Sequence, residues 1–416
     1  MLSRAALVVA LLILSVSAAG AQPGGDSASA SSAADAQRPA QAGTTTSTPA
    51  TPDDDGYVER SRRWAKNAKI FERLSGTTDG WYPRLGGMTR GSGFALGPGY
   101  RTHVFGDRVL LDLSTAISTK AYKATDAKAR WLQAFDKRLE LWTDLRYEVF
   151  PQEDFFGIGN DSSLARQTSY ARETFYASAR ASFAVLPWLR LGGVSGYARP
   201  RVGHGTDRAF PSIEELFTDA DAPGLVGEPD FLHATIFAEL DGRDVPGRPR
   251  SGGFTRVAYG TWNDRTLDRY DFRRFDVDTI GFVPLDANKS HVLSGRIGVS
   301  YVNNAPGHRI PFYYLAYVGG VDTLRSYREY RFQDENAMWM SAEYLWATPI
   351  QFATVAAFVD AGQVRSNWQD LGLGGLRHGY GAGLRFHSDK QTFARFDVGT
   401  GGGEGWRMFL QLAPTF

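Results

Sequence analysis

Apolar and polar residues alternate along most of the chain after Gly80. The clearest case runs from Leu139 to Val149. Its apolar positions are Leu139, Leu141, Leu145, Tyr147 and Val149, and its charged positions are Glu140, Asp144, Arg146 and Glu148. Successive side chains of a β-strand point to opposite faces, so this period of two predicts a strand with one apolar and one charged face, which only Trp142 interrupts. The pattern fits a soluble sandwich, whose charged face meets bulk water, and a membrane barrel, whose charged face lines a wet lumen.

The same pattern predicts an even number of strands. Sixteen segments carry it: 80–89, 93–104, 108–119, 122–135, 138–149, 169–184, 188–198, 230–242, 252–264, 270–283, 289–302, 337–348, 351–364, 377–388, 391–400 and 406–416. Membrane barrels have short periplasmic turns and longer outer loops, so the two kinds of connection should alternate. The long connections are 150–168, 199–229, 303–335 and 365–376, and all fall on one side of this arrangement. This regularity favours an all-β, antiparallel barrel.

The first 76 residues differ from the rest. Residues 1–21 carry Arg4, an apolar stretch and a small-residue end at Ala21, which is typical of a cleaved signal peptide. Residues 22–56 contain no aromatic residue and no Leu, Ile, Val or Met, so we expect a disordered linker. Residues 57–76 follow a helical period with many basic residues, which indicates an amphipathic helix that lies on a membrane or braces a neighbouring domain. We expect the barrel to span residues 77–416.

Three features favour the membrane barrel over the sandwich. They are the predicted export signal, the strand length of about ten residues, and an alternating last strand that ends in an aromatic residue. The last predicted strand should turn Met408, Leu410, Leu412 and Phe416 toward lipid, with Arg407 and Gln411 inward. A terminal Phe on an alternating strand resembles the assembly signal of bacterial outer-membrane barrels. We therefore expect Phe416 to be recognised by the barrel-assembly machinery, and the protein to reside in the bacterial outer membrane in contact with its lipid.

Composition narrows the alternatives further. The chain contains no cysteine, which excludes disulfides and thiolate metal sites. Removing the leader with its one Arg leaves 45 basic and 45 acidic residues, so nothing favours nucleic acid. Searches for catalytic motifs find no H-E-x-x-H and no G-x-S-x-G sequence. We expect neither enzyme activity, nor a metal, nor a cofactor.

The most informative residues lie in the connection 303–335 and the two strands after it. Gly319 and Gly320 are followed by Leu324-Arg325-Ser326-Tyr327, the next strand carries Glu343, and the one after it reads Phe358-Val359-Asp360-Ala361-Gly362. This pattern resembles the bacterial surface antigen family of outer-membrane assembly and secretion barrels, which includes the barrel-assembly pore and two-partner secretion transporters. The family's Gly-Gly and V/L-R-G-F/Y motif lies on an outer loop that folds back into the lumen. The resemblance implies a re-entrant loop between strands eleven and twelve.

Alternation places Glu343 on one face with Ser341 and Leu345, and it places Asp360 on one face with Phe358, so we expect both carboxylates to point inward. A guanidinium, with its fork of donors, suits two carboxylates better than an ammonium does. By resemblance, Arg325 is the loop-tip arginine, and Glu343 and Asp360 are its partners on the wall. Ser326 stands where the family has glycine, so a positive φ at this position would strain the turn.

Two further sequence features bear on function. The family's assembly and secretion members carry periplasmic polypeptide-transport-associated domains, which this sequence is expected to lack. The strands expected to meet at the barrel seam pair weakly, because the first contains Gly86 and Gly87 and the last contains Pro414. We expect a barrel that gates or translocates a polypeptide or lipid cargo through its lumen or seam. The alternatives are a passive pore or small-molecule transporter and, last, a barrel enzyme.

Overall fold

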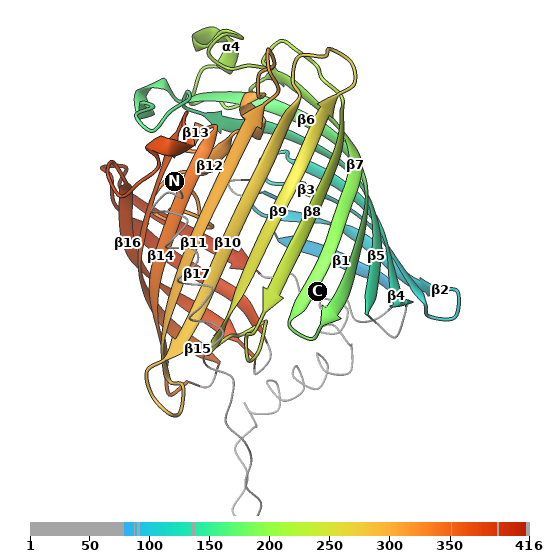
Figure 1. Cartoon of the computed structure of the whole chain (residues 1–416), viewed down its shortest axis with the longest axis vertical. Helices are drawn as coiled ribbons and strands as arrows, with labels where there is room; N and C mark the ends of the chain where they lie inside the picture. The colour runs from blue at the N-terminus through green and yellow to red at the C-terminus, as the bar shows by residue number, and fades with distance from the viewer. Residues whose placement is uncertain are drawn as a thin grey trace, which may run out of the picture. The chain divides into compact units, whose positions relative to one another are not determined.

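The computed structural model describes residues 79–86, 88–89, 92–134, 138–350, 352–388 and 391–412. The predicted signal peptide, linker and helix, and the terminal Phe416, lie outside these residues. Figure 1 shows the long strands curled into a barrel wall. Among the described residues, no helix is long and apolar enough to cross a membrane.

Sixteen strands form the wall, as predicted. The first half comprises β1 (Gly80–Gly86), β2 (Ala95–Val104), β3 (Val109–Ser118), β4 (Lys123–Ala134), β5 (Leu139–Phe155), β6 (Thr168–Leu186), β7 (Leu189–His204) and β8 (Phe231–Asp241). The second half comprises β9 (Gly252–Asp264), β10 (Phe272–Pro284), β11 (His291–Asn304), β14 (Asn336–Ala347), β15 (Ala353–Arg365), β16 (Arg377–His387), β17 (Thr392–Thr400) and β18 (Trp406–Leu412). Each described wall strand is antiparallel to its neighbours along the chain, and β11 pairs with β14 across the longest loop. The predicted topology is therefore confirmed.

β1 and β18 are the two edges of this sheet, and no backbone pairing joins them among the described residues. β1 is short, and two of its residues, Gly80 and Gly86, have positive φ angles of 108° and 124°. Pro83 also lies in this strand and lacks a backbone N–H. Of the residues on which the expected weak seam rests, Gly86 lies on the described edge, whereas Gly87 and Pro414 lie outside the described residues.

The predicted alternation is visible in the burial of the wall strands. Large apolar side chains such as Leu145 and Tyr147 are exposed on the outer face, whereas Arg146 of the same strand points inward and donates to Asp126 at 2.6 Å. Trp142, the exception in the sequence pattern, also has a polar environment. The guanidinium groups of Arg130 and Arg180 lie 4.8 and 5.5 Å from the centre of its ring. The aromatic residue at this charged position therefore serves as a cation–π partner.

Strands β5 and β7 extend further on the outer side than the sequence predicted, to Phe155 and His204. Their extra residues do not continue the wall alternation, and the β5–β6 register shifts between Phe150 and Glu153. The extension of β5 instead contributes Phe155 to an apolar core that also contains Tyr170 of β6 and Phe312, from the loop between β11 and β14. Both rings meet Phe312 edge to face, at 5.0 and 4.9 Å. Packing with distant loops thus determines where these strands end.

Short elements build the outer loops around this apolar core. They are the 3-10 turns η1 (Leu164–Arg166), η2 (Phe312–Tyr314) and η3 (Trp368–Asp370), the helix α4 (Ile213–Leu216), and a two-stranded sheet of β12 (Ala316–Val318) and β13 (Phe332–Asp334). The sequence predicted only loops here. The β12–β13 pair holds together the two ends of residues 319–331, which we call the lumenal loop.

Candidate functional site in the barrel lumen

Two glycines shape the start of the lumenal loop. Gly319 and Gly320 have φ angles of 124° and 87°, in the region that side-chain-bearing residues avoid. A Cβ atom on Gly319 would lie 2.3 Å from the carbonyl oxygen of Arg328, so the space is closed as well. The hydroxyl of Thr323 accepts from the Gly319 N–H at 2.8 Å and donates to the Gly319 carbonyl at 2.9 Å. These contacts stabilise a tight turn, after which Leu324, Arg325 and Ser326 lie against the barrel wall.

Arg325 lies at the tip of this turn and is 3% exposed. Its Nε donates to Asp360 Oδ2 at 2.8 Å, and its Nη2 donates to Asp360 Oδ1 at 2.6 Å. Nη2 also donates to the Ser341 hydroxyl at 2.8 Å, and Nη1 donates to Glu343 Oε2. The guanidinium lies 3.5 Å from the centre of the Phe358 ring. The structure therefore brings Arg325 together with both predicted carboxylates and adds Ser341 and Phe358.

Further charges on the wall support the same carboxylates. Arg385 of β16 donates to Glu343 Oε1 at 2.8 Å and to Asp397 Oδ1 at 2.6 Å. Arg395 of β17 donates to Asp397 Oδ2 at 2.5 Å. Three guanidinium groups and three carboxylates form one network with no net formal charge. Burying a single charge is costly, whereas a balanced and hydrogen-bonded set offsets much of that cost.

Glycines of the wall make room for the loop tip. A Cβ atom on Gly379 of β16 would lie 2.0 Å from the Ser326 hydroxyl, and one on Gly399 of β17 would lie 3.0 Å from the Arg325 carbonyl oxygen. A Cβ atom on Gly362 of β15 would lie 2.7 Å from Leu324. Ser326 is fully buried and is not among the residues with positive φ, so the strain considered from the sequence does not arise. The feature that sets Ser326 apart is the close approach of its side chain to Gly379 of the wall.

Tyr327 completes the predicted loop motif. It is 2% exposed, and its hydroxyl donates to the carbonyl of His378 on β16 at 3.2 Å. The wall residues Arg385, Arg395, Asp397 and Gly379 were not predicted from the sequence. Two signals in the sequence could have found them. Alternation puts Arg385 on the same face as Gly379, Gly381 and Gly383, and Arg395 on the same face as Asp397. Glycines at every second position indicate a strand face that another segment approaches closely.

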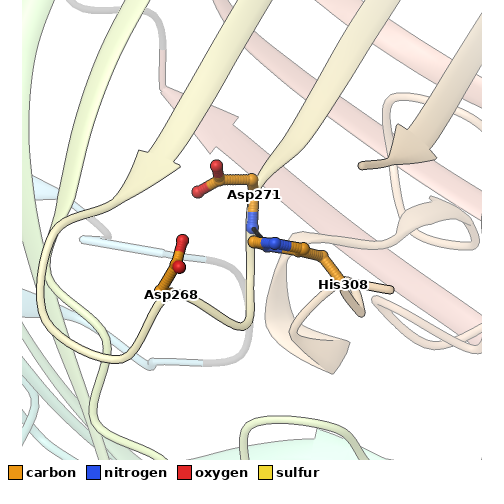
Figure 2. Close-up of side chains that lie close together, drawn as sticks. All are labelled: Asp268, Asp271 and His308. Atoms are coloured by element: carbon orange, nitrogen blue, oxygen red, sulfur yellow. Dashed lines mark hydrogen bonds between the residues drawn. The ribbon is translucent and has the colours of Figure 1, made fainter. Parts of the chain in front are cut away.

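The structure also holds a cluster of possible metal ligands on the outer loops. Asp268, Asp271 and His308 offer ligand atoms within 4.8 Å of one another, and Figure 2 shows them at the junction of two loops. However, His308 Nδ1 accepts a hydrogen bond from the Asp271 backbone N–H at 3.0 Å. The other ring nitrogen of a neutral imidazole then carries the proton and has no lone pair for a cation. Asp271 Oδ1 accepts from the Asp264 backbone N–H at 2.7 Å, so the cluster braces the loops.

Comparison with known proteins agrees with this architecture. The model of the Omp85 superfamily domain matches residues 135–402, which is more than half of the chain. The structure of BamA from Haemophilus ducreyi lacking POTRA domains 1–3 aligns with a TM-score of 0.57 and 16% identity, over 79% of this chain and 67% of that one. CdiB from Escherichia coli aligns with a TM-score of 0.50 and 10% identity, over 80% of this chain and 60% of that one. At these identities the two structures establish a shared fold, and the family match goes further: the chain belongs to the Omp85 superfamily of bacterial outer-membrane barrels.

Proposed function

We propose that this outer-membrane barrel gates the movement of a polypeptide or a lipid through its lumen or its seam, with the lumenal loop as the gate. In this proposal Arg325, Glu343 and Asp360 form the clamp that holds the gate in place. Omp85 barrels are in general transport and assembly proteins, which agrees with a gating role. The resemblance to the surface antigen family and the contacts of Arg325 support the assignment of this loop.

One observation carries the proposal, namely the complete engagement of the Arg325 side chain by the wall. Its guanidinium makes four hydrogen bonds, to Asp360, Glu343 and Ser341. The Arg325 backbone N–H also donates to Asp360 Oδ2, at 3.1 Å. All of these bonds join the loop to strands and none lies within the loop, so they stabilise one position of the loop relative to the wall. A cluster of bonds centred on one side chain suits a reversible gate.

The outer loops favour a gated barrel over a passive pore. The apolar core around Phe155, Tyr170 and Phe312 includes residues from the ends of the strands and from the loop between β11 and β14. Such a core stabilises the loops against one another, whereas a passive pore requires a wide, open lumen. We therefore place the passive pore second.

The proposal includes the parts of the chain for which the sequence is the only guide. Residues 1–21 would direct export, residues 22–56 would act as a linker, and residues 57–76 would form a helix next to a barrel that spans residues 77–416. The barrel-assembly machinery would recognise Phe416 during biogenesis. The cargo is defined only by its class, a polypeptide or a lipid.

The experiment measures ion conductance through the reconstituted full chain in planar bilayers, with ions as the probe of an open lumen. Arg325→Ala should increase the open probability, because the clamp is removed, and Arg325→Lys should have an intermediate effect because an ammonium lacks the two-pronged geometry. Arg256→Ala is the matched control, since Arg256 pairs with Glu239 on the wall itself. Conductance of Arg325→Ala equal to that of the parent protein, with its loop accessible to protease, would reject the gate.

A further inference from the structure

The last outer loop, between β17 and β18, has only one side chain. Residues 401–405 are Gly-Gly-Gly-Glu-Gly. All four glycines have positive φ angles, with values of 152° for Gly401, 62° for Gly402, 80° for Gly403 and 78° for Gly405. A backbone of this shape excludes most other residues. Any contact that a side chain of this loop makes must therefore come from Glu404.

Glu404 points into the protein although it lies on an outer loop. Its side chain is 5% exposed, and Oε1 accepts a hydrogen bond from Nε of Arg331 at the end of the lumenal loop. The Arg331 side chain is 6% exposed, and its Nη1 donates to the Ser162 hydroxyl of the β5–β6 loop at 2.9 Å. The Arg331 guanidinium lies 4.4 Å from the ring centre of Phe332 and 4.9 Å from that of Phe156. Arg331 thus joins three outer segments.

The same hairpin meets the lumenal loop at a second point. A Cβ atom on Gly402 would lie 1.9 Å from the Tyr327 hydroxyl, so this glycine allows the loop tip to pack closely against the hairpin. On the β18 side, Arg407 Nη2 donates to the Glu404 carbonyl oxygen at 3.3 Å. β18 is an edge strand that pairs only with β17 among the described residues. The lumenal loop therefore contacts the hairpin that forms one side of the seam.

We propose that Arg331 and Glu404 are positioning residues that couple the lumenal loop to the edge strand β18. An inserted loop holds the β17–β18 hairpin in place, and a withdrawn loop releases it, so the position of the loop regulates the seam. This inference rests on the proposed function and names the element on which the gate acts. Coupling of this kind is reciprocal, and loosening the hairpin must also favour withdrawal of the loop.

Burial makes this ion pair more than a surface contact. Exposed pairs contribute little, because water screens them and the long side chains lose conformational freedom. Removing one partner of a buried pair leaves an uncompensated charge, which is much more costly. Glu404 Oε2 has no hydrogen-bond partner among the described residues, so the carboxylate depends on Arg331. Without Arg331, the glycine-rich loop must rearrange to bring Glu404 to water, and the start of β18 must move with it.

The experiment uses hydrogen exchange with mass spectrometry on the full chain in lipid nanodiscs, and it follows residues 406–412 of β18. Arg331→Gln and Glu404→Gln should each increase exchange in this segment by roughly fivefold or more, a typical size for coupling between sites. Arg325→Ala should also increase it, but should add no further increase in the Glu404→Gln background. The control is Arg201→Gln, because Arg201 pairs with Asp230 and Glu228 on another part of the outer surface.

Two further measurements separate coupling from general destabilisation. The exchanged pair Arg331→Glu with Glu404→Arg should restore protection of β18, and Glu404→Gln alone should increase protease cleavage within residues 319–331. The inference is overturned if Glu404→Gln has no larger effect on β18 than Arg201→Gln, or if Arg325→Ala frees the loop while β18 exchange stays unchanged. If Arg325→Ala does not free the loop, the proposed gate fails, and the two Gln variants still decide whether the hairpin and the loop are coupled.

Discussion

Replacing Arg325 by alanine removes four side-chain hydrogen bonds between the lumenal loop and the wall. The two carboxylates are affected unequally. Glu343 keeps Arg385 at 2.8 Å. Asp360 is fully buried, and among the described residues it keeps only the Ser341 hydroxyl at 2.7 Å and the backbone N–H of residue 325. Most of the cost should therefore come from Asp360.

The magnitude follows from the burial of the Arg325–Asp360 pair. Breaking a buried ion pair by removing one partner costs about 3 to 5 kcal/mol. Water in the lumen can hydrate Asp360 once the guanidinium is gone, so the lower end applies, and about 3 kcal/mol lowers the ratio of inserted to withdrawn loop by roughly two orders of magnitude. The wall itself rests on strand pairing that the substitution leaves intact. We expect the folded barrel to persist with a loosened loop.

Limited proteolysis in detergent or nanodiscs measures this directly. Chymotrypsin and proteinase K should cut Arg325→Ala within residues 319–331 much faster than the parent protein, while heat-modifiable gel mobility stays near that of the parent. Arg256→Ala should leave the loop protected. Unchanged cleavage of the Arg325→Ala loop would refute the reasoning, as would loss of the folded band at the same rate as the loop is cut.

Three other changes follow from the structure. Gly379→Ala should displace the loop tip at a cost of about 1 to 3 kcal/mol, the usual range for overpacking. Adding Ser326→Gly to this variant should recover the lost stability, because it removes the side chain that the new methyl group meets. Gly281→Ala is the control, since a Cβ atom there meets nothing within 4 Å. A double variant as unstable as Gly379→Ala alone would argue against the contact. In the turn between β8 and β9, burial alone would raise the pKa of Asp244, but hydrogen bonds from the Arg250 backbone N–H and the Lys289 ammonium hold this pKa well below its usual range. A lowered folded-state pKa stabilises the fold above the unfolded value of about 3.9 and loses this effect as the pH falls further. The difference in melting temperature between the parent protein and Asp244→Asn should therefore shrink below about pH 4, and a difference independent of pH would contradict this. Deleting Phe416 should lower the amount of folded barrel in the outer membrane, and normal amounts would count against its role as an assembly signal.

The wall was predictable because its information is local. Alternation within each segment specifies which residues face inward, and the lengths of the connections specify the side on which each turn lies. The same alternation placed Glu343 and Asp360 on the inner face, and the short motif around Arg325 pointed to the loop that reaches them. Each of these inferences needs only residues close together in the sequence.

The rest depends on contacts between distant segments. Arg385 bridges Glu343 and Asp397 because the register across β14 to β17 aligns these residues, and no spacing within a single strand specifies that register. The outer end of β5 packs on Phe312, which is more than a hundred residues away in the chain. Arg331 and Glu404 are separated by 73 positions, and only the folded barrel brings them together. These features follow from packing.

The clamp itself is tested most directly by a double-mutant cycle between Arg325 and Asp360. The free energy of loop opening is measured by hydrogen exchange of residues 319–331 in the parent protein, in Arg325→Ala, in Asp360→Ala and in the double variant. If the two side chains interact as the structure indicates, the double variant should lose clearly less than the sum of the single losses, with a coupling of about 1 to 3 kcal/mol. Strict additivity of the two losses would mean that Arg325 and Asp360 do not hold the loop together, and it would contradict the proposed gate.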